Sequence, residues 1–308
     1  MTLIVNALQA DRGNPGFAGE LLGANLHEPP APALVATVEA AMAKYGVVVL
    51  RDQFIDDAEQ LRFARAFGPL ELPPHWGLAD NSRPRVAPGL YDISNLDENG
   101  ALLPAHSIQY ASNKANEEFH TDSSFNELPT KWSMLSARVI PPAGGDTEFC
   151  DARAAYDALP VELQARAEAA IAEHWYWHTR GTAIYQTITD DMRRAMPPAR
   201  HRCVRTVAGR KALYLGAHAT HIVGWPRADG EHFIKELNAH SARPDFRYRH
   251  VWRPADLLIW DNRCVLHRAT GFDATRDKRD MRRATMNEHG PEISSTDALG
   301  VPAPRGSC

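Results

Sequence analysis

Short apolar segments that end at turn-forming residues restrict the folds open to this chain more than any other feature. Residues 47–52 are typical of a buried strand, and residues 132–140 predict another. Residues 258–269 predict a strand, a tight turn at Asp261 and Asn262, and a second strand. Strands of this length with turns between them predict a jelly roll or a related fold of two packed sheets.

Helical patterns lie near the start of the chain and in its middle. Residues 28–46 predict a helix after a proline-rich lead, because apolar residues recur at helical spacing and Gly46 follows as a stop. Residues 56–68 predict a second helix, and residues 154–175 predict a third that Pro160 interrupts. Helices and short strands together predict an α+β fold.

No segment of the chain is typical of a linker between domains. The proline-rich stretch 69–89 predicts a loop, and the tail after about residue 290 is of low complexity and is expected to be disordered. The chain has 308 residues, 44 % of them hydrophobic, which is enough for one large core. We therefore expect a single domain over residues 1–308.

Composition argues against several kinds of partner. A net charge of −4 and a pI of about 6.4 give no reason to expect nucleic acid. We find no apolar run long enough for a membrane span and no signal peptide. The four cysteines form no CxxC motif and no close pair, so we expect no disulfides and a cytoplasmic location.

His120 and Asp122 stand two residues apart in the segment 119–125. In a strand, residues at this spacing point to the same face, so the two side chains could converge on one metal ion. A further histidine would complete the 2-His-1-carboxylate set that suits non-haem Fe(II). The alternative is chance, because a chain with 14 histidines and 38 acidic residues is expected to contain about one such pair.

A late histidine and a basic run strengthen the metal hypothesis. His267 lies near the end of the segment 258–269, and Arg279 and Arg283 follow it, four residues apart. Even spacing in a strand places both guanidinium groups on one face, where each is a planar partner for a carboxylate. The alternative is a solvated charge run at the surface.

These motifs resemble the family of taurine dioxygenase and 2,4-dichlorophenoxyacetate dioxygenase, whose members are Fe(II)- and 2-oxoglutarate-dependent oxygenases. The resemblance runs from about Tyr45 to Thr285, with the motifs in the family's order. It is closer to the phenoxyacetate branch than to the taurine branch. The segments that carry it include FGPLE, DISN, FHTDSSF, GGDTEFCD, LGAHATH and WDNRCVLHRAT.

The resemblance implies a double-stranded β-helix (jelly roll) core with flanking helices, and a homo-oligomer, either a dimer or a tetramer. By this resemblance His120, Asp122 and His267 would hold Fe(II). Arg279 and Thr147 would bind the far carboxylate of 2-oxoglutarate, and O2 would be the second co-substrate. The histidines and the carboxylate would thus act as one catalytic set.

Arg283 and several further residues are expected on the substrate side. By the resemblance, Arg283 would hold the anionic head of the substrate, and Ser123 could offer its backbone N–H to the same anion. Trp260 is more typical of a core position. The other pocket candidates, for which packing is an alternative role, are His75 and Trp76 in a loop, His218 and His221, and the aromatic cluster 175–178.

The resemblance implies that the enzyme hydroxylates a small organic anion, most closely an aryloxyalkanoate such as a phenoxyacetate herbicide. Hydroxylation beside the ether oxygen would give a hemiacetal that falls apart to a phenol and a 2-oxo acid. Lysines expected near the substrate are missing from segments 71–77 and 98–104, which leaves the substrate open. The alternatives are a taurine or alkylsulfonate dioxygenase, a non-catalytic jelly roll that binds an anion, and a zinc hydrolase.

Overall fold

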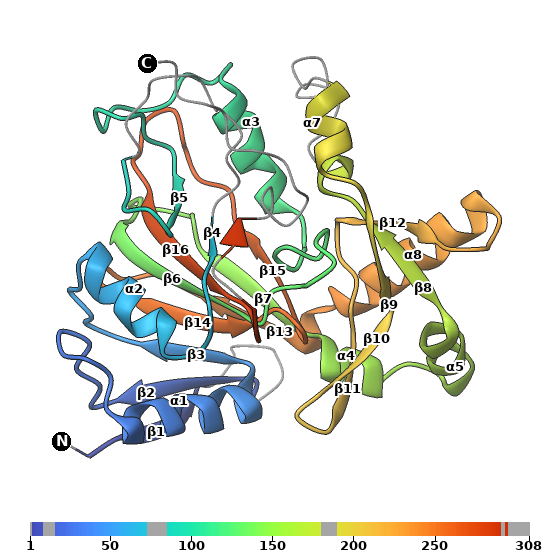
Figure 1. Ribbon diagram of the computed structural model, residues 1–308, viewed down its shortest axis with the longest axis horizontal. Coiled ribbons are helices and arrows are strands. Elements are labelled where there is room, and N and C mark those ends of the chain that lie inside the picture. Colours follow the sequence, from blue (N-terminus) through green and yellow to red (C-terminus); the bar gives the residue numbers. More distant parts are fainter. Residues whose placement is uncertain (1, 9–15, 73–84, 180–189, 291–292, 295–308) are drawn as a thin grey trace.

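Two β-sheets pack against each other at the centre of the molecule (Figure 1). The computed structural model describes residues 2–8, 16–72, 85–179, 190–290 and 293–294. The larger sheet has the order β1 (Ile4–Leu8), β2 (Ala18–Leu22), β3 (Val47–Leu50), β14 (Leu257–Asp261), β6 (Trp132–Val139), β16 (Asp280–Met286) and β5 (Tyr91–Ser94). The smaller sheet has the order β13 (Arg247–His250), β7 (Thr147–Asp151) and β15 (Val265–Ala269). These two sheets form the predicted jelly-roll core.

The large sheet is buried on both faces, and β3 shows this most directly. Val47 and Val49 belong to the cluster that also contains Phe149 of the small sheet. Val48 and Leu50 point the other way, into a second cluster with side chains of the N-terminal helices. A strand covered on both faces is apolar at successive positions, which is why residues 47–52 predicted a buried strand.

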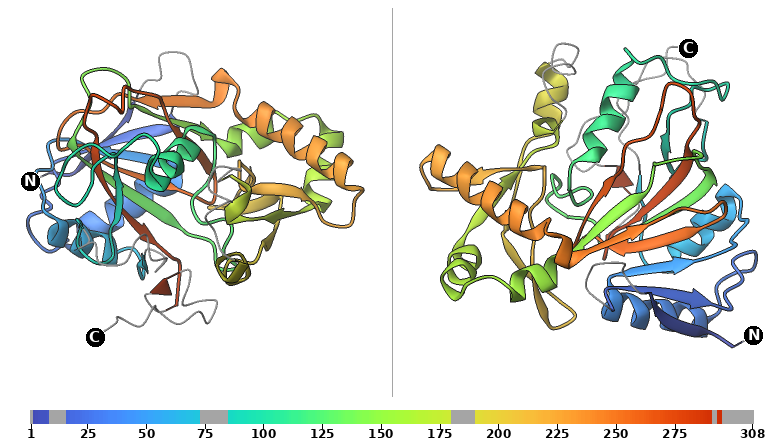
Figure 2. Two further views of the ribbon diagram at one scale, coloured as in Figure 1. Left: turned by 90° about the horizontal axis from the view of Figure 1, so that it is seen from above. Right: turned by 180° about the vertical axis from the view of Figure 1, so that it is seen from behind.

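Helices α1 (Pro32–Tyr45) and α2 (Asp57–Arg65) cover the outer face of the large sheet (Figures 1 and 2). Gly46 ends α1 in a left-handed conformation with φ of 80°, and its N–H donates to the carbonyl of Met42. Asp56 begins α2 with a capping box, in which Glu59 is its partner. Both predicted helices are confirmed, and both follow from ordinary start and stop signals.

The predicted turn at Asp261 and Asn262 carries the chain from one sheet to the other. The N–H of Cys264 donates to the carbonyl of Asp261 at 3.1 Å and closes the turn. Strand β14 before the turn lies in the large sheet, whereas β15 after it lies in the small sheet. This corner places His267 where the two sheets meet.

A second group of elements lies beside the core, on the right in Figure 1. It contains the sheet β9-β8-β12, the hairpin of β10 and β11, and helix α8, which packs on β12. The strands are β8 (Ile171–His174), β9 (Ala199–Arg202), β10 (Val204–Val207), β11 (Arg210–Leu213) and β12 (Ala219–Ile222). The other helices within the described residues are α3 (Ile108–Lys114), η1 (Ala115–Glu117), α4 (Ala152–Asp157), α5 (Val161–Ala169), η2 (Tyr176–His178), α7 (Asp190–Ala195), α8 (Arg227–Ser241) and η3 (Pro244–Phe246).

The helical prediction for residues 154–175 is only partly correct. Helices α4 and α5 flank Pro160, as the sequence indicated, but α5 ends at Ala169. Residues Ile171–His174 form strand β8, which pairs with β9 on one side and β12 on the other. Pairing with two neighbours overrode the local preference of an alanine- and glutamate-rich segment for helix.

Further predictions concern the cysteines, the tail of the chain, the loop 69–89 and membrane spans. Cys150, Cys203 and Cys264 are buried and form no disulfides. Beyond residue 290 the structure describes Ile293–Ser294, strand β17, which runs parallel to β4 (Glu71–Leu72). The rest of the predicted disordered tail, and most of the predicted loop 69–89, lie outside the described residues. Among the helices that the structure describes, none has the length and apolar character to span a membrane.

Candidate active site

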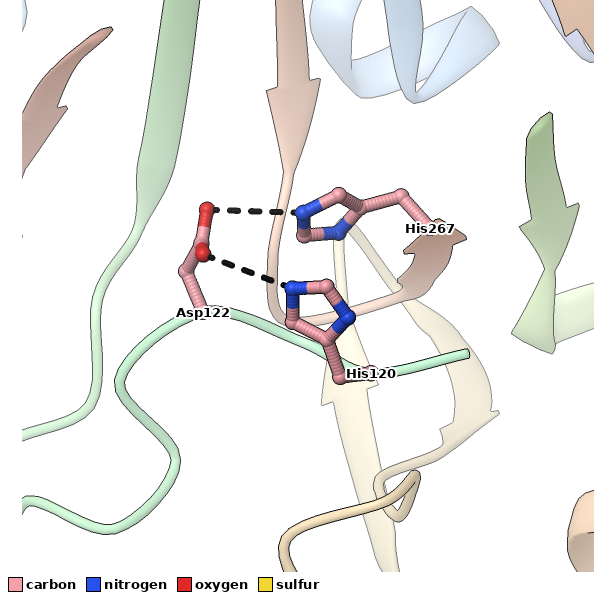
Figure 3. Close-up of side chains that lie close together, drawn as sticks. All are labelled: His120, Asp122 and His267. Carbon is pink, nitrogen blue, oxygen red and sulfur yellow. Dashed lines mark ion pairs between the residues drawn. The ribbon is translucent and has the colours of Figure 1, made fainter. Parts of the chain in front are cut away.

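The side chains of His120, Asp122 and His267 point toward one another (Figure 3). Each residue offers one ligand atom, these atoms lie within 4.8 Å of one another, and all three residues are buried. Nε2 of His120 lies 3.9 Å from Oδ1 of Asp122, and Nε2 of His267 lies 3.7 Å from Oδ2. The structure therefore assembles the predicted 2-His-1-carboxylate set.

A backbone bridge joins the early and late parts of this set. His120 and His267 exchange backbone hydrogen bonds, with N–O distances of 3.0 and 2.8 Å. Asp122 does not continue a strand, contrary to the expectation for this segment, because the chain turns directly after the bridge. Ser123 adopts a left-handed conformation in this turn, with φ of 53°. The turn, rather than strand alternation, brings the carboxylate back to the two imidazoles.

Burial and nearby charges keep His267 and Asp122 in the forms that bind metal. Burial, with His120 close by, lowers the pKa of His267 to about 3, so its imidazole is neutral. Burial alone would raise the pKa of Asp122, but the charge of Arg283 and a hydrogen bond from Ser133 hold it well below its usual range. Nδ1 of His120 lies 2.8 Å from the carbonyl oxygen of Glu118, which leaves Nε2 facing the site. Two imidazoles and one carboxylate fit Fe(II).

A pocket opens beside these ligands. Its walls come from β5, α3 and η1 on one side, and from β7, β15 and the segment before β16 on the other. Its apolar surface includes the ring of Trp260, which is also a buried core residue. The predicted site residues that line it are His120, His267, Thr147, Arg279 and Arg283.

Arg279 is a buried cation at the pocket wall. Its Nε donates to the carbonyl of Gly145 at 3.1 Å, and among the described residues no carboxylate forms an ion pair with its guanidinium. Burial lowers the pKa of Arg279 to about 10, so the group stays charged at neutral pH. Thr147, in the same pocket, accepts the indole N–H of Trp252 at 3.0 Å, so its own hydroxyl hydrogen can point to another acceptor. A buried guanidinium and a hydroxyl together fit the far carboxylate of 2-oxoglutarate.

Arg283 lies closer to the metal ligands. Its Nη1 donates to Oδ1 of Asp122, and its guanidinium carbon lies 4.5 Å from the ring centroid of Tyr91. Like Arg279, it lines the pocket, but strand spacing is not the reason, because Arg279 precedes β16 and the register shifts between Asp280 and Met281. The pocket thus contains a second cation beside the metal ligands.

Other predicted substrate residues lie around the site rather than in the pocket wall. The hydroxyl of Ser123 donates to the buried carboxylate of Glu71 at 2.7 Å. The ring of His218 lies 5.8 Å from that of His120, whereas His221 lies 3.8 Å from Glu173. His75 and Trp76 fall outside the described residues.

The aromatic cluster 175–178 divides into two roles. The indole N–H of Trp175 donates to the carbonyl of Met196 at 2.9 Å, and Trp177 is buried against the same methionine. The ring of Tyr176 lies 4.9 Å from that of Phe125, which in turn lies 5.0 Å from His218. Tyr176 therefore extends an aromatic group toward the ligands, while the two tryptophans pack.

Sequence reasoning missed the pocket wall formed by α3 and η1. This wall supplies Tyr110, Asn113, Lys114, Asn116 and Glu117. Lys114 is the lysine of this wall, and it pairs with Glu117 at 2.8 Å. The segment is polar and has no helical repeat of apolar residues, so its sequence carried no signal that could have placed it at the site.

Comparison with known proteins places the chain among enzymes with such a site. Residues 9–285 match the model of the family described as taurine catabolism dioxygenase TauD, TfdA family. The chain is 43 % identical over 276 residues to an alpha-ketoglutarate-dependent 2,4-dichlorophenoxyacetate dioxygenase of Burkholderia sp. strain RASC, covering 88 % of this chain and 92 % of that protein. It is 34 % identical over 249 residues to an (S)-phenoxypropionate/alpha-ketoglutarate-dioxygenase of Sphingobium herbicidovorans, covering 78 % and 82 %.

Solved structures agree with this result. A crystal structure of AAD-2 in complex with Mn(II) and N-oxalylglycine matches with a TM-score of 0.83 and 39 % identity, covering 95 % of this chain and 99 % of that one. A taurine dioxygenase from Burkholderia xenovorans matches with a TM-score of 0.70 and 26 % identity, covering 94 % and 92 %. The chain is thus more similar in sequence to the 2,4-dichlorophenoxyacetate dioxygenase, at 43 % identity, than to this taurine dioxygenase, at 26 %, as the sequence motifs indicated. The chain belongs to the TauD, TfdA family and is a 2-oxoglutarate-dependent dioxygenase that uses Fe(II), 2-oxoglutarate and O2.

Proposed function

We propose that this dioxygenase hydroxylates an aryloxyalkanoate beside its ether oxygen, and that the product falls apart to a phenol and a 2-oxo acid. The observation that carries the proposal is the pair of cations in one pocket beside the metal ligands. Arg279 suits one carboxylate and Arg283 suits another, so the pocket has a partner for 2-oxoglutarate and a partner for an organic acid. The substrates named for the two relatives described above are organic acids of this kind.

In the proposed mechanism His120, Asp122 and His267 would hold the iron as a 2-His-1-carboxylate set. When bound, iron, 2-oxoglutarate and O2 supply the oxidant for hydroxylation of a C–H bond. The task of Arg279 and Thr147 is to fix the far carboxylate of 2-oxoglutarate. The task of Arg283 and of the aromatic side chains of the pocket wall is to orient the substrate.

Arg283 would bind the substrate carboxylate as a two-pronged partner and so direct the adjacent C–H bond toward the metal. The rings of Tyr110 and Trp260 in the pocket wall support an aryl group in the substrate. Lys114 provides a further positive charge in the same wall. We also propose that the backbone N–H of Ser123 donates to the substrate anion. Further contacts with the substrate would come from His75, Trp76 and His218.

A taurine or alkylsulfonate dioxygenase is the second candidate, because a sulfonate suits Arg283 as well as a carboxylate does. Aromatic side chains at the pocket favour an aryl ether over a short alkylsulfonate. For a catalytically silent protein there would be no reason to retain three ligands and a separate buried guanidinium. For a zinc hydrolase, Arg279 would have no function.

We further propose that the protein is a cytoplasmic homo-oligomer, either a dimer or a tetramer, with one catalytic domain per chain. The free cysteines at 150, 203 and 264 support a reducing compartment. The oligomeric state follows from the resemblance to the family. Light scattering coupled to gel filtration would test it, and a monomer at micromolar concentration would contradict it.

Succinate release from 2-oxoglutarate with Fe(II) would test the function. The panel would contain aryloxyacetates, both enantiomers of aryloxypropionates, taurine and longer sulfonates. We expect one of the aryl ethers to be turned over fastest with release of a phenol, and His120→Ala and Asp122→Ala to be inactive yet folded. If a sulfonate were faster than every aryl ether, the substrate assignment would fail while the iron assignment survived. Normal activity of either variant would overturn the ligand assignment.

A further inference from the structure

The carboxylate of Asp122 is held by a buried chain of hydrogen bonds that begins at Asn262. We propose that Asn262, acting through Ser133 and directly on the backbone N–H of Asp122, is a positioning residue that fixes Asp122 for metal binding. The inference rests on the proposed metal site. It assigns a role in that site to two residues that are not themselves ligands.

The first link acts on the carboxylate. Oγ of Ser133 donates to Oδ2 of Asp122 at 2.7 Å, and Nδ2 of Asn262 donates to the same Oγ at 2.9 Å. A serine hydroxyl has one hydrogen to give. Because the Asn262 amide donates to this oxygen, the hydrogen of Ser133 is directed to Asp122, and the carboxylate loses its freedom to rotate.

The second link acts on the main chain that carries the ligand. Oδ1 of Asn262 accepts the backbone N–H of Asp122 at 3.2 Å, and the backbone carbonyl of Asn262 accepts the hydroxyl of Thr121 at 2.6 Å. Asn262 therefore holds Asp122 from both sides, at its amide and at its carboxylate. The backbone at this point needs such support, because the next residue, Ser123, adopts the left-handed conformation, in which non-glycine residues are uncommon.

The same asparagine also fixes a wall of the pocket. The indole N–H of Trp260 donates to Oδ1 of Asn262 at 3.0 Å, and the ring of Trp260 lies 4.7 Å from that of His267. Oδ1 of Asn262 accepts two N–H groups, and Nδ2 donates to the hydroxyl oxygen of Ser133. These partners determine which way the amide group is oriented. A single side chain thus ties one ligand directly and packs an aromatic ring against another.

Burial makes these hydrogen bonds a rigid unit. Ser133 is 0 % exposed and Asn262 is 1 % exposed, so water does not compete for their partners. Groups that hydrogen-bond to metal ligands typically affect metal affinity as well as stability. A buried hydrogen bond elsewhere in the same sheet affects stability alone. A loss of metal affinity therefore distinguishes a residue that positions a ligand from one that only packs.

Strand β6 supplies a matched control. Ser136 lies on the same strand as Ser133, is also buried, and donates to Oε1 of Gln60 at 2.7 Å, on the side of α2. Its hydrogen bonds do not include the metal ligands. Ser136→Ala therefore removes a comparable hydrogen bond without touching the site.

The experiment is calorimetric titration of the metal-free full-length protein with Mn(II), together with urea unfolding of the same metal-free samples. Ser133→Ala should weaken Mn(II) binding by roughly 10- to 100-fold. Asn262→Ala should weaken it at least as much, because it removes both links, and the double variant should lose less than the sum of the two single losses, because the link through Ser133 is shared. Ser136→Ala should lower unfolding stability yet keep Mn(II) affinity within about twofold of wild type.

Wild-type Mn(II) affinity in Ser133→Ala would overturn the proposal, as would an equal loss of affinity in Ser136→Ala. Fully additive losses in the double variant would also overturn it, because the two residues would then act separately. The proposed function has its own readout. A wild-type protein that binds Mn(II) but releases no succinate with Fe(II) would refute the function and leave the positioning result standing.

Discussion

At the scale of single residues, Arg279 offers the sharpest test of how the co-substrate binds. Replacing it with alanine should raise the KM for 2-oxoglutarate severely, because a charge-assisted pair in a buried site is lost. Such a loss costs about 2–5 kcal/mol, or roughly 30- to several-thousand-fold in affinity. Steady-state kinetics with varied 2-oxoglutarate would measure it. The control is Arg276→Ala, since that side chain is 74 % exposed and pairs with Asp273 and Asp277. An unchanged KM in Arg279→Ala would place the anchor elsewhere.

Arg283 should separate the co-substrate from the substrate. Arg283→Ala should keep the KM for 2-oxoglutarate near normal, weaken binding of the organic acid, and raise the ratio of succinate formed to substrate consumed. Arg283→Lys should recover only part of the loss, because an ammonium lacks the planar fork of a guanidinium. The matched control is Arg282→Ala, since Arg282 is the neighbouring residue of β16 and pairs with Asp57 at 2.9 Å. A wild-type ratio and wild-type substrate affinity in Arg283→Ala would refute the assignment.

The sequence predicted those residues of the candidate site whose type itself indicates a role in metal binding. The residues His120, Asp122 and His267 carry their ligand chemistry in their side chains, and the motif order identified them. Asn262 and Ser133 do not, because asparagine and serine occur throughout any chain. Their hydrogen bond spans 129 positions of sequence, so only the packed sheets bring them together.

At the scale of elements, the start of α2 is set by its cap. Asp56 accepts the N–H of Glu59 at 2.8 Å, and Glu59 accepts the N–H of Asp56 at 2.8 Å. Asp56→Ala should lower the free energy of unfolding by about 1 kcal/mol, whereas Asp56→Ser should lose little, because serine caps nearly as well. Urea unfolding of both variants would measure the difference. Equal stability of the alanine and serine variants would show that tertiary packing, not the cap, holds this end of α2.

Helices α1 and α2 were predictable because their signals are local: a proline lead, a capping box and a glycine stop. Strand β8 was not. Its four residues, Ile171–His174, follow a helix directly and include alanine and glutamate, which favour helix. Their strand conformation depends on hydrogen bonds to β9 and β12, which begin 28 or more positions later in the chain. Sequence alone identifies elements whose stabilising interactions lie within the element. It misses elements that depend on hydrogen bonds to distant strands.

At the scale of the whole molecule, buried histidines make the fold sensitive to acid. Burial lowers the pKa of His174 to about 3 and also lowers the pKa values of His201 and His250. These groups accept protons near pH 6.5 in the unfolded chain but resist protonation in the folded one. Between these pKa values the unfolded state binds more protons, so the free energy of unfolding falls as the pH falls below about 6.5.

His174 is the group through which this dependence can be measured. It is fully buried, with Nδ1 3.0 Å from the hydroxyl of Ser124, and the rings of His201 and Tyr214 lie 5.4 and 5.7 Å away. Arg205 adds a further positive charge that opposes its protonation. His174→Phe should lower stability near neutral pH, because Ser124 loses its partner. Between pH 6 and pH 4 it should also reduce the slope of stability against pH by about 1.4 kcal/mol per pH unit. Urea unfolding of metal-free wild type and variant across this range separates the two effects, since the first shifts the curve and the second flattens it. A variant curve parallel to that of wild type would mean that His174 is protonated as readily in the folded state as in the unfolded state, which its complete burial beside the cationic Arg205 opposes.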